Sequence, residues 1–316
     1  MIRISRRDLL LATGATVGAV ALTARTPAQS AARAVVRVGS VGTDVSAEPF
    51  YAAETGIAAR NGIEIRPQVF AGGGAIIDAI VGGALDAGFS NLSSVAAARN
   101  RELPIVVLAP ATVFVSSAPI TLLMRARGSK LRTGADLNGK TIAISTLKGE
   151  LQIAASAWID KNGGDVKSVR FLELPFPSMA AALDRGRVDA AMISEPSLTR
   201  GREEIERLGD AYGAIADTLL IGGYVATESW VRANRDTARR FRAAIIESAR
   251  WANAHHGETA EILEKSMKLD AEIARTMRRA TYGDRLSPDL IQPMLDAGAK
   301  YGIIKPIRTS DLLASV

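Results

Sequence analysis

Short apolar runs alternate with amphipathic segments along the chain after residue 34. Apolar runs of about four to eight residues are typical of buried strands, and longer stretches with helical spacing of apolar residues are typical of helices. One series begins with the strand expected at residues 35–41 and ends with that at 105–108, and a second extends from 141–145 to 188–193. Strands that alternate with helices predict βαβ units and an α/β fold.

A short internal repeat indicates that the two series form two similar lobes. Residues 83–87 (Gly-Ala-Leu-Asp-Ala) recur as residues 186–190 (Gly-Arg-Val-Asp-Ala). In each copy a helix is expected to end at the glycine, which adopts left-handed backbone at little cost, and a buried strand follows. From Thr227 onward the pattern is mainly helical, which predicts extra C-terminal helices that pack on a lobe.

The N-terminus is typical of a bacterial export signal. Residues 5–10 (Ser-Arg-Arg-Asp-Leu-Leu) precede an uncharged run at 9–24, which at about 16 residues is shorter than the roughly 20 that span a bilayer. Paired arginines before leucines indicate the twin-arginine export machinery, and the alternative is the general secretory route. Small residues place the cleavage near residues 30–34, so we expect a periplasmic protein.

Composition and charge exclude several functions. The formal net charge is +6, but residues 1–34 hold five arginines and one acid, which leaves about +2 for the rest and makes nucleic acid a poor partner. The chain has no cysteine, which excludes disulfides, thiolate metal sites and a cysteine nucleophile. Its two histidines, His255 and His256, are adjacent and diverge on a helix. We therefore expect no metal, no cofactor and no enzyme, although a carboxylate acid–base pair stays open.

Ligands of open α/β sheets lie beyond the carboxyl ends of the strands. The residues expected there are rich in glycine and hydroxyl groups: Ser40, Gly42, Thr43, Gly72, Gly73, Gly74, Ser90, Asn91, Ser145, Thr146, Gly149, Ser194 and Glu195. Alternatives exist for several of them. The three glycines can form a plain turn, Ser90 and Asn91 can cap a helix, and Glu195 can stabilise the first turn of one.

The chain resembles a known family at residues spread through most of its length. The matching positions are Pro49, Ala53, Gly56, 62–65, Gly83, 85–87, 136–137, 139–140, 181–183, Gly186, 188–191, 195–196, Trp230, 239–241 and 251–252. On these residues it resembles the periplasmic solute-binding proteins of the nitrate/sulfonate/taurine class of ABC importers, which are related to pyrimidine-precursor binders.

The resemblance implies a type II periplasmic-binding-protein fold with two lobes joined by two crossing segments. Residues 35–119 with 227–316 would form the first lobe, residues 125–221 the second, and residues 120–124 and 222–226 the hinge. By position, solute contacts would fall at Thr43, Phe50, Gly73, Ser90, Asn91, Ser145, Gly149, Pro177 and Glu195, and with Thr146 beside Ser145 these make ten predicted contact residues.

The function implied is capture of a small anionic organic solute, such as a sulfonate or carboxylate, by a monomer that delivers it to an ABC permease with its ATPase. The alternatives are an enzyme on the same fold, resembling pyrimidine synthases, and a solute-sensing signalling partner. Such enzymes depend on a histidine and a cysteine-rich loop, which this chain does not match.

Two departures from the family pattern weaken the case for taurine or a simple alkanesulfonate. Lys148-Gly149-Glu150 replaces a turn rich in serine and threonine, and Ser194 replaces an aromatic residue before Glu195. Glu150 either lies beside the solute and repels an anion, or points outward as an acid of the first helical turn. A small carboxylate or a heterocycle stays open.

Overall fold

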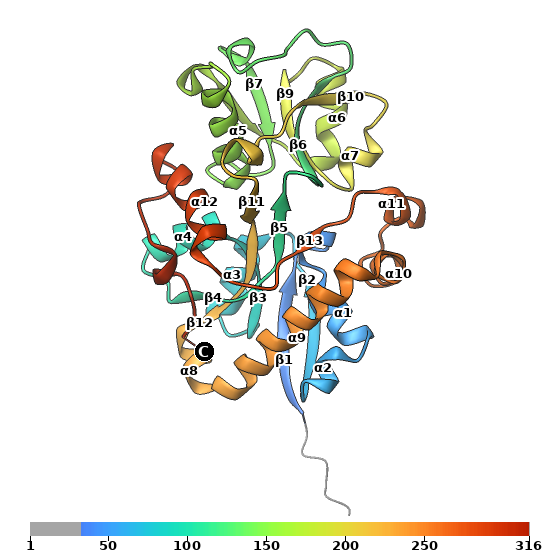
Figure 1. The fold of residues 1–316 in the computed structure, drawn as a ribbon, viewed down its shortest axis with the longest axis vertical. Coiled ribbons are helices and arrows are strands. Elements are labelled where there is room, and N and C mark those ends of the chain that lie inside the picture. The colour runs from blue at the N-terminus through green and yellow to red at the C-terminus, as the bar shows by residue number, and fades with distance from the viewer. Residues whose placement is uncertain (1–32, 316) are drawn as a thin grey trace, which may run out of the picture. The chain divides into compact units, whose positions relative to one another are not determined.

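Two five-stranded sheets organise residues 33–315, the part of the chain that the computed structural model describes (Figure 1). The first sheet has the order β2-β1-β3-β12-β4, with β1 (Ala34–Ser40), β2 (Ile63–Val69), β3 (Ala87–Asn91), β4 (Ile105–Pro110) and β12 (Gly222–Thr227). The second has the order β10-β6-β9-β7-β8, with β6 (Thr121–Ala126), β7 (Thr141–Ile144), β8 (Arg170–Glu173), β9 (Ala190–Ser194) and β10 (Ile205–Gly209). Each sheet forms the centre of one lobe.

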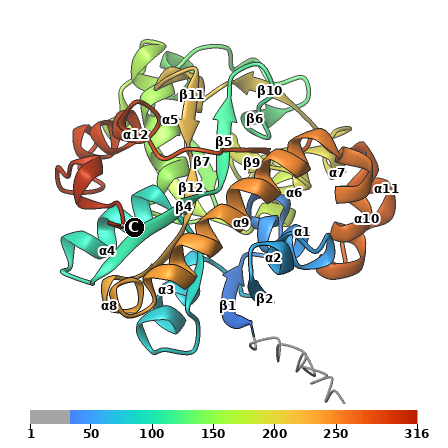
Figure 2. The same cartoon turned by 60° about the horizontal axis from the view of Figure 1, so that its bottom comes forward.

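Helices cover both faces of the first sheet (Figure 2). One face packs against α1 (Glu48–Glu54), α2 (Ile57–Arg60), α8 (Glu228–Ala233) and α9 (Arg235–Ala254). The other packs against α3 (Gly73–Val81), α4 (Leu92–Asn100) and the C-terminal α12 (Pro288–Lys300). The strands are therefore apolar on both sides, which explains the continuous apolar runs in the sequence.

The second sheet repeats this arrangement. Its helix α5 (Glu150–Lys161) covers one face, and α6 (Phe176–Asp184) and α7 (Ser197–Arg200) cover the other. In each sheet four strands run in one direction and one strand runs antiparallel between two of them: β12 between β3 and β4, and β6 between β9 and β10.

The internal repeat occupies equivalent places in the two sheets. Gly83 and Gly186 have φ of 75° and 64°, and the aspartates that follow them precede β3 and β9. Asp86 Oδ2 accepts the backbone N–H of Arg37 at 2.8 Å, and Asp189 Oδ2 accepts that of Thr141 at 2.9 Å. Each aspartate thus joins the start of its own strand to the neighbouring parallel strand.

A third, three-stranded sheet lies between the other two. It consists of β11 (Thr218–Leu220), β5 (Thr112–Val115) and β13 (Thr281–Tyr282), all antiparallel. The chain passes to the second sheet through β5 and returns through β11. Most of residues 120–124 and 222–226, where the sequence predicts the crossings, belong instead to β6 and β12. The predicted lobe boundaries and hinge action stay proposals.

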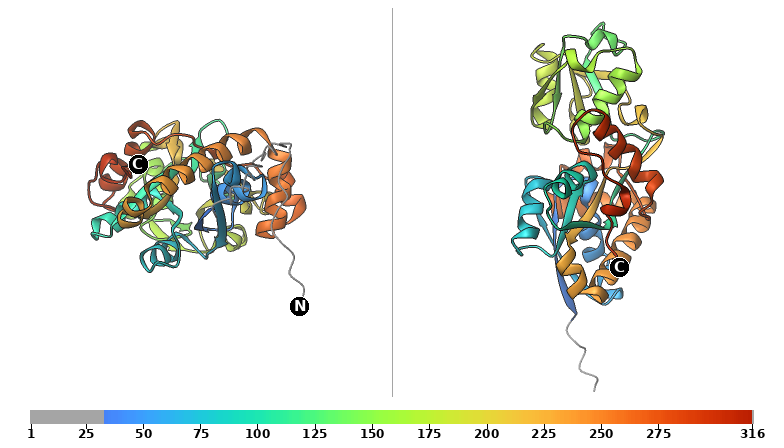
Figure 3. Two further views of the ribbon diagram at one scale, coloured as in Figure 1. Left: turned by 90° about the horizontal axis from the view of Figure 1, so that it is seen from below. Right: turned by 90° about the vertical axis from the view of Figure 1, so that its left-hand side faces the viewer.

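The C-terminal helices contact both lobes. Helix α12 packs against α4 of the first lobe and α5 of the second (Figure 3). The helices α10 (His256–Met267) and α11 (Ala271–Thr276) follow α9, and α11 contacts α7 of the second lobe. Short 3-10 helices complete the chain at η1 (Asp44–Ser46), η2 (Ala135–Leu137), η3 (Val166–Ser168), η4 (Tyr212–Ala214) and η5 (Thr309–Asp311).

A buried ion pair joins η1 to the segment before β13. The Arg279 guanidinium donates to both oxygens of Asp44 at 2.9 Å, and the Ala280 N–H donates to Oδ2 at 2.7 Å. The Tyr282 hydroxyl also donates to Asp44, at 2.7 Å. Burial opposes ionisation of Asp44, but the nearby Arg279 and these donors keep the pKa of the carboxyl below its usual value.

The predicted export signal, residues 1–34, lies outside the described residues except for its last two. Ala34 already belongs to β1. None of the helices between residues 33 and 315 combines the length and apolarity that a bilayer crossing requires.

We expect Arg279→Met to lower the free energy of unfolding by about 3–5 kcal/mol, because it leaves the Asp44 carboxylate buried without its cation. Urea denaturation measures this. The matched control is Lys265→Met, which removes an exposed ion pair with Glu54 and should cost less than about 1 kcal/mol. Equal, small losses in both variants would contradict the role given to the buried pair.

Candidate functional site

A cleft of about 830 Å³ lies between the two five-stranded sheets. The first lobe contributes the residues that follow β1, β2 and β3, and the second contributes those that follow β7, β8 and β9. Strands β5 and β11 meet at its base, where Phe114 and Ile221 line it. Both lobes therefore present the carboxyl ends of their parallel strands to one space, as open α/β sheets generally do.

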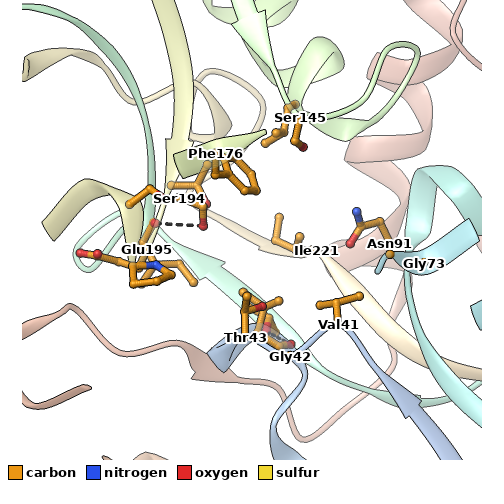
Figure 4. A pocket seen from close by; sticks show the side chains of 18 of the residues that line it. Val41, Gly42, Thr43, Gly73, Asn91, Ser145, Phe176, Ser194, Glu195 and Ile221 are labelled. Carbon is orange, nitrogen blue, oxygen red and sulfur yellow. Dashed lines mark hydrogen bonds between the residues drawn. The ribbon is translucent and has the colours of Figure 1, made fainter. Parts of the chain in front are cut away.

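Polar side chains from the two lobes face this space (Figure 4). Thr43 and Asn91 come from the first lobe and Ser145 from the second, with Ile221 between them. Thr43 and Asn91 occupy the N-cap positions of η1 and α4, yet neither side chain makes a capping hydrogen bond. Their polar atoms are thus available to a solute. The alternative interpretation, that the side chain of Asn91 caps a helix, is not supported.

Ser194 and Glu195 also line the cleft, but other groups of the protein use their oxygens. Ser194 Oγ accepts from Thr121 Oγ1 at 2.9 Å. Glu195 accepts from the backbone N–H and hydroxyl of Thr199, both at 3.1 Å, and from the Arg278 N–H at 3.3 Å. Glu195 thus holds the start of α7 and connects it to the segment after α11.

The structure brings seven of the ten predicted contact residues to the cleft: Thr43, Gly73, Asn91, Ser145, Thr146, Pro177 and Glu195. Phe50, Ser90 and Gly149 do not line it. Phe50 lies on the buried side of α1, and Ser90 lies in β3 between the lining residues Phe89 and Asn91, with its buried hydroxyl near Gly73. Gly149 is the N-cap of α5 and comes directly before Glu150, which does line the cleft. Whether the seven contact a solute stays a prediction.

Glu150 is buried in the wall of the cleft, so the outward-pointing interpretation of this residue is wrong. It begins α5 and lies beside Tyr212 of η4, whose hydroxyl hydrogen-bonds to it. Burial raises the pKa of the carboxyl to about 8, although the Tyr212 hydrogen bond acts in the opposite direction. At neutral pH the empty cleft therefore holds Glu150 mainly as the uncharged acid.

The aromatic residues of the cleft are not the one that the sequence predicted, Phe50. Phe89, Phe114, Phe176 and Tyr212 all line the cleft, and the rings of Phe114 and Tyr212 lie 5.4 Å apart. Phe176 is adjacent to Pro177, which was predicted, so its position next to Pro177 could have indicated that it belongs to the site. Tyr212 lies in η4, between β10 and β11. The sequence pattern did not predict this short helix.

Acidic groups outweigh basic ones inside the cleft. Among its described lining residues the buried charged side chains are Glu150 and Glu195, whereas Arg200 and Lys268 are exposed at its edge. Residues 33–315 include no group of three or more side chains suited to hold a metal ion. Both histidines belong to the α9–α10 junction, where His255 stacks on Trp251.

The family model described as "NMT1/THI5 like" matches residues 45–259. The chain belongs to this family. The match covers most of both lobes, including β2–β12 but not β1. No curated protein sequence matches the chain.

Solved structures agree with this assignment at the level of the fold. The periplasmic aliphatic sulphonate-binding protein SsuA from Escherichia coli is 16% identical, with a TM-score of 0.73 over 88% of this chain and 91% of that one. The periplasmic nitrate-binding protein NrtA from Synechocystis PCC 6803 is 15% identical, with a TM-score of 0.72 over 89% and 84%. The predicted two-lobed periplasmic-binding-protein fold is thereby confirmed.

The same fold also occurs in an enzyme. The desulfurization enzyme DszB is 13% identical, with a TM-score of 0.63 over 89% of this chain and 96% of that one. Membership of the fold does not by itself separate binding from catalysis.

The buried acids predict that stability falls between about pH 4.5 and 8. Burial raises the pKa of Glu150 and of Glu48, a second buried acid outside the cleft, to about 8. The folded state then keeps protons that the unfolded chain has lost, and each acid lowers the free energy of unfolding by up to about 1.4 kcal/mol per pH unit. Urea denaturation at pH 5, 6, 7 and 8 measures this slope.

The variants Glu48→Gln and Glu150→Gln should each flatten this dependence, because an amide does not titrate. A slope that is unchanged in both variants would contradict the protonated state assigned to the two acids.

Proposed function

We propose that this protein is a periplasmic solute-binding receptor, which captures a small organic solute between its lobes and delivers it to an ABC permease with its ATPase. The observation that carries the proposal is the cleft, where side chains from both lobes face one another and Thr43 and Asn91 keep free polar atoms. The similarity of the fold to the periplasmic sulphonate-binding protein SsuA and the nitrate-binding protein NrtA supports the same role.

Catalysis has no comparable support. The chain contains no cysteine, and neither histidine is among the lining residues of the cleft. A serine or threonine in the cleft would therefore have no imidazole base beside it. We propose binding without turnover. The alternative is an enzyme on the same fold, as in DszB, and an assay for product formation tests it.

The proposed cycle is closure of the two lobes about β5 and β11. A solute that contacts both walls stabilises the closed form, and the importer recognises that form. Export by the twin-arginine machinery, or by the general route, would place the receptor where the importer needs it. A monomer is sufficient for this role because the described cleft is formed by one chain.

A thermal-shift screen of the purified protein against sulfonates, carboxylates, nitrate and pyrimidines tests the proposal. A micromolar ligand at millimolar concentration should stabilise the folded state by about 4 kcal/mol. For the solute found, Asn91→Ala and Ser145→Ala should each weaken binding about 5- to 10-fold, because each removes a hydrogen bond worth about 1 kcal/mol.

The matched control is Ser248→Ala, which removes a buried hydroxyl of α9 that is not among the lining residues of the cleft. It should leave the affinity unchanged. Absence of any stabilising solute would contradict the receptor role, and conversion of a bound solute to product would establish the enzyme instead.

A further inference from the structure

The wall of the cleft formed by the second lobe combines a buried carboxyl with aromatic rings. Glu150 lines the cleft with only 9% of its surface exposed, and Tyr212 and Phe114 lie next to one another on the same side. Phe176 lines this wall as well. A carboxyl beside a phenol ring, in a cleft that further aromatic side chains line, is a chemical environment suited to an organic cation, because aromatic rings and a carboxylate both attract positive charge.

The remaining groups of the cleft do not favour an anion at this wall. The N-terminus of α5 attracts negative charge, but Glu150 is its first residue and supplies that charge when it ionises. The basic side chains that line the cleft, Arg200 and Lys268, are exposed at its edge. An anionic group placed beside Glu150 would therefore meet a second acid without a buried cation to balance it.

We infer that Glu150 is a specificity-determining residue, which selects solutes carrying a protonated nitrogen by accepting a hydrogen bond from it and ionising. This rests on the proposed receptor function. The Tyr212 hydroxyl can donate to one carboxyl oxygen, which leaves the other for the solute. The proton released by Glu150 passes to solvent, and the resulting carboxylate pairs with the cation.

The groups around Glu150 allow its ionisation to be linked to solute binding without interference from a neighbouring titration. Tyr212 from η4 faces it and stays protonated, since burial raises the pKa of its hydroxyl well above the usual value. The other elements packed against α5 are η3, α4 and α12, with Lys167, Arg99, Asp296 and Lys300 among their charged residues. None of these acts on Glu150, for which burial and Tyr212 are the causes of the shift.

Matched pairs of solutes that differ by an amino group test this inference. The probes are ethanesulfonate and taurine, propionate and β-alanine, and benzoate and 4-(aminomethyl)benzoate, together with any solute found in the broader screen. We expect the amino member of the recognised pair to bind more tightly, and Glu150→Gln to raise its Kd about 10- to 100-fold. Gln has nearly the shape of the uncharged glutamic acid that it replaces in the wall of the cleft, so the variant should fold.

The pH dependence of binding provides the second readout. With the pKa of the empty site at about 8, the Kd of the amino solute should fall about 50-fold from pH 6 to pH 8, and titration calorimetry should detect release of about one proton. In Glu150→Gln both effects should disappear. Glu48→Gln is the matched control: this acid is also buried with its pKa raised to about 8, but it lies outside the cleft, so the linkage should persist.

Three outcomes would overturn the inference while leaving the receptor role intact. They are a recognised solute without a protonable nitrogen, an amino solute whose Kd does not change in Glu150→Gln, and affinity that falls as the pH rises from 6 to 8. The last would mean that the neutral acid donates to an anion. Failure of every solute in both panels would contradict the receptor role itself, and this inference with it.

Discussion

The buried ion pair of Asp44 and Arg279 is the interaction on which the architecture of the cleft depends. Asp44 holds η1, and the neighbours Thr43 and Val45 line the cleft. Arg279 belongs to the segment that continues into β13 and the central sheet. The adjacent Arg278 donates its N–H to Glu195 at 3.3 Å and its guanidinium to the Pro119 carbonyl at 3.2 Å. One buried charge pair thus fixes the wall of the first lobe and positions the C-terminal segment against the second.

Strands and helices that consist of continuous or periodic apolar runs could be predicted from the sequence. The repeat at 83–87 and 186–190 correctly indicated two similar sheets, because the positive φ of each glycine and the following aspartate are local requirements. The helical region from residue 48 to residue 60 is interrupted at Gly56, whose φ of 73° separates α1 from α2.

Elements whose partners are distant in sequence could not be predicted. Strand β13 is two residues long and exists because Thr281 and Tyr282 pair with β5. Strand β12 adds antiparallel to a sheet that the βαβ pattern predicted as parallel. In the cleft, the residues at strand ends followed from topology, whereas Tyr212 and Phe176 did not. Glu150 is buried beside Tyr212, which is distant in the sequence. The local sequence alone could not predict this, because an acid in the first turn of a helix that points outward has the same local pattern.

The fold supports both binding and catalysis, so the side chains of the cleft must distinguish them. This chain combines free polar atoms at Thr43 and Asn91 with a buried acid, and it lacks cysteine. A buried carboxyl that gains its charge only when a partner arrives makes affinity depend on the chemistry of the solute. The same acid lowers the stability of the empty protein at neutral pH, a cost that a site selected for binding can carry.

Closure of the two lobes on a solute can be measured directly by the distance between spin labels. Val69 at the end of β2 and Leu147 after β7 lie on different lobes and are 55% and 45% exposed, and the chain has no other cysteine to label. With Val69→Cys and Leu147→Cys labelled, pulsed electron double resonance should give a shorter, narrower distance distribution when a stabilising solute saturates the cleft. A distribution unchanged by saturating solute would contradict closure, and with it the account of this protein as a two-lobed receptor.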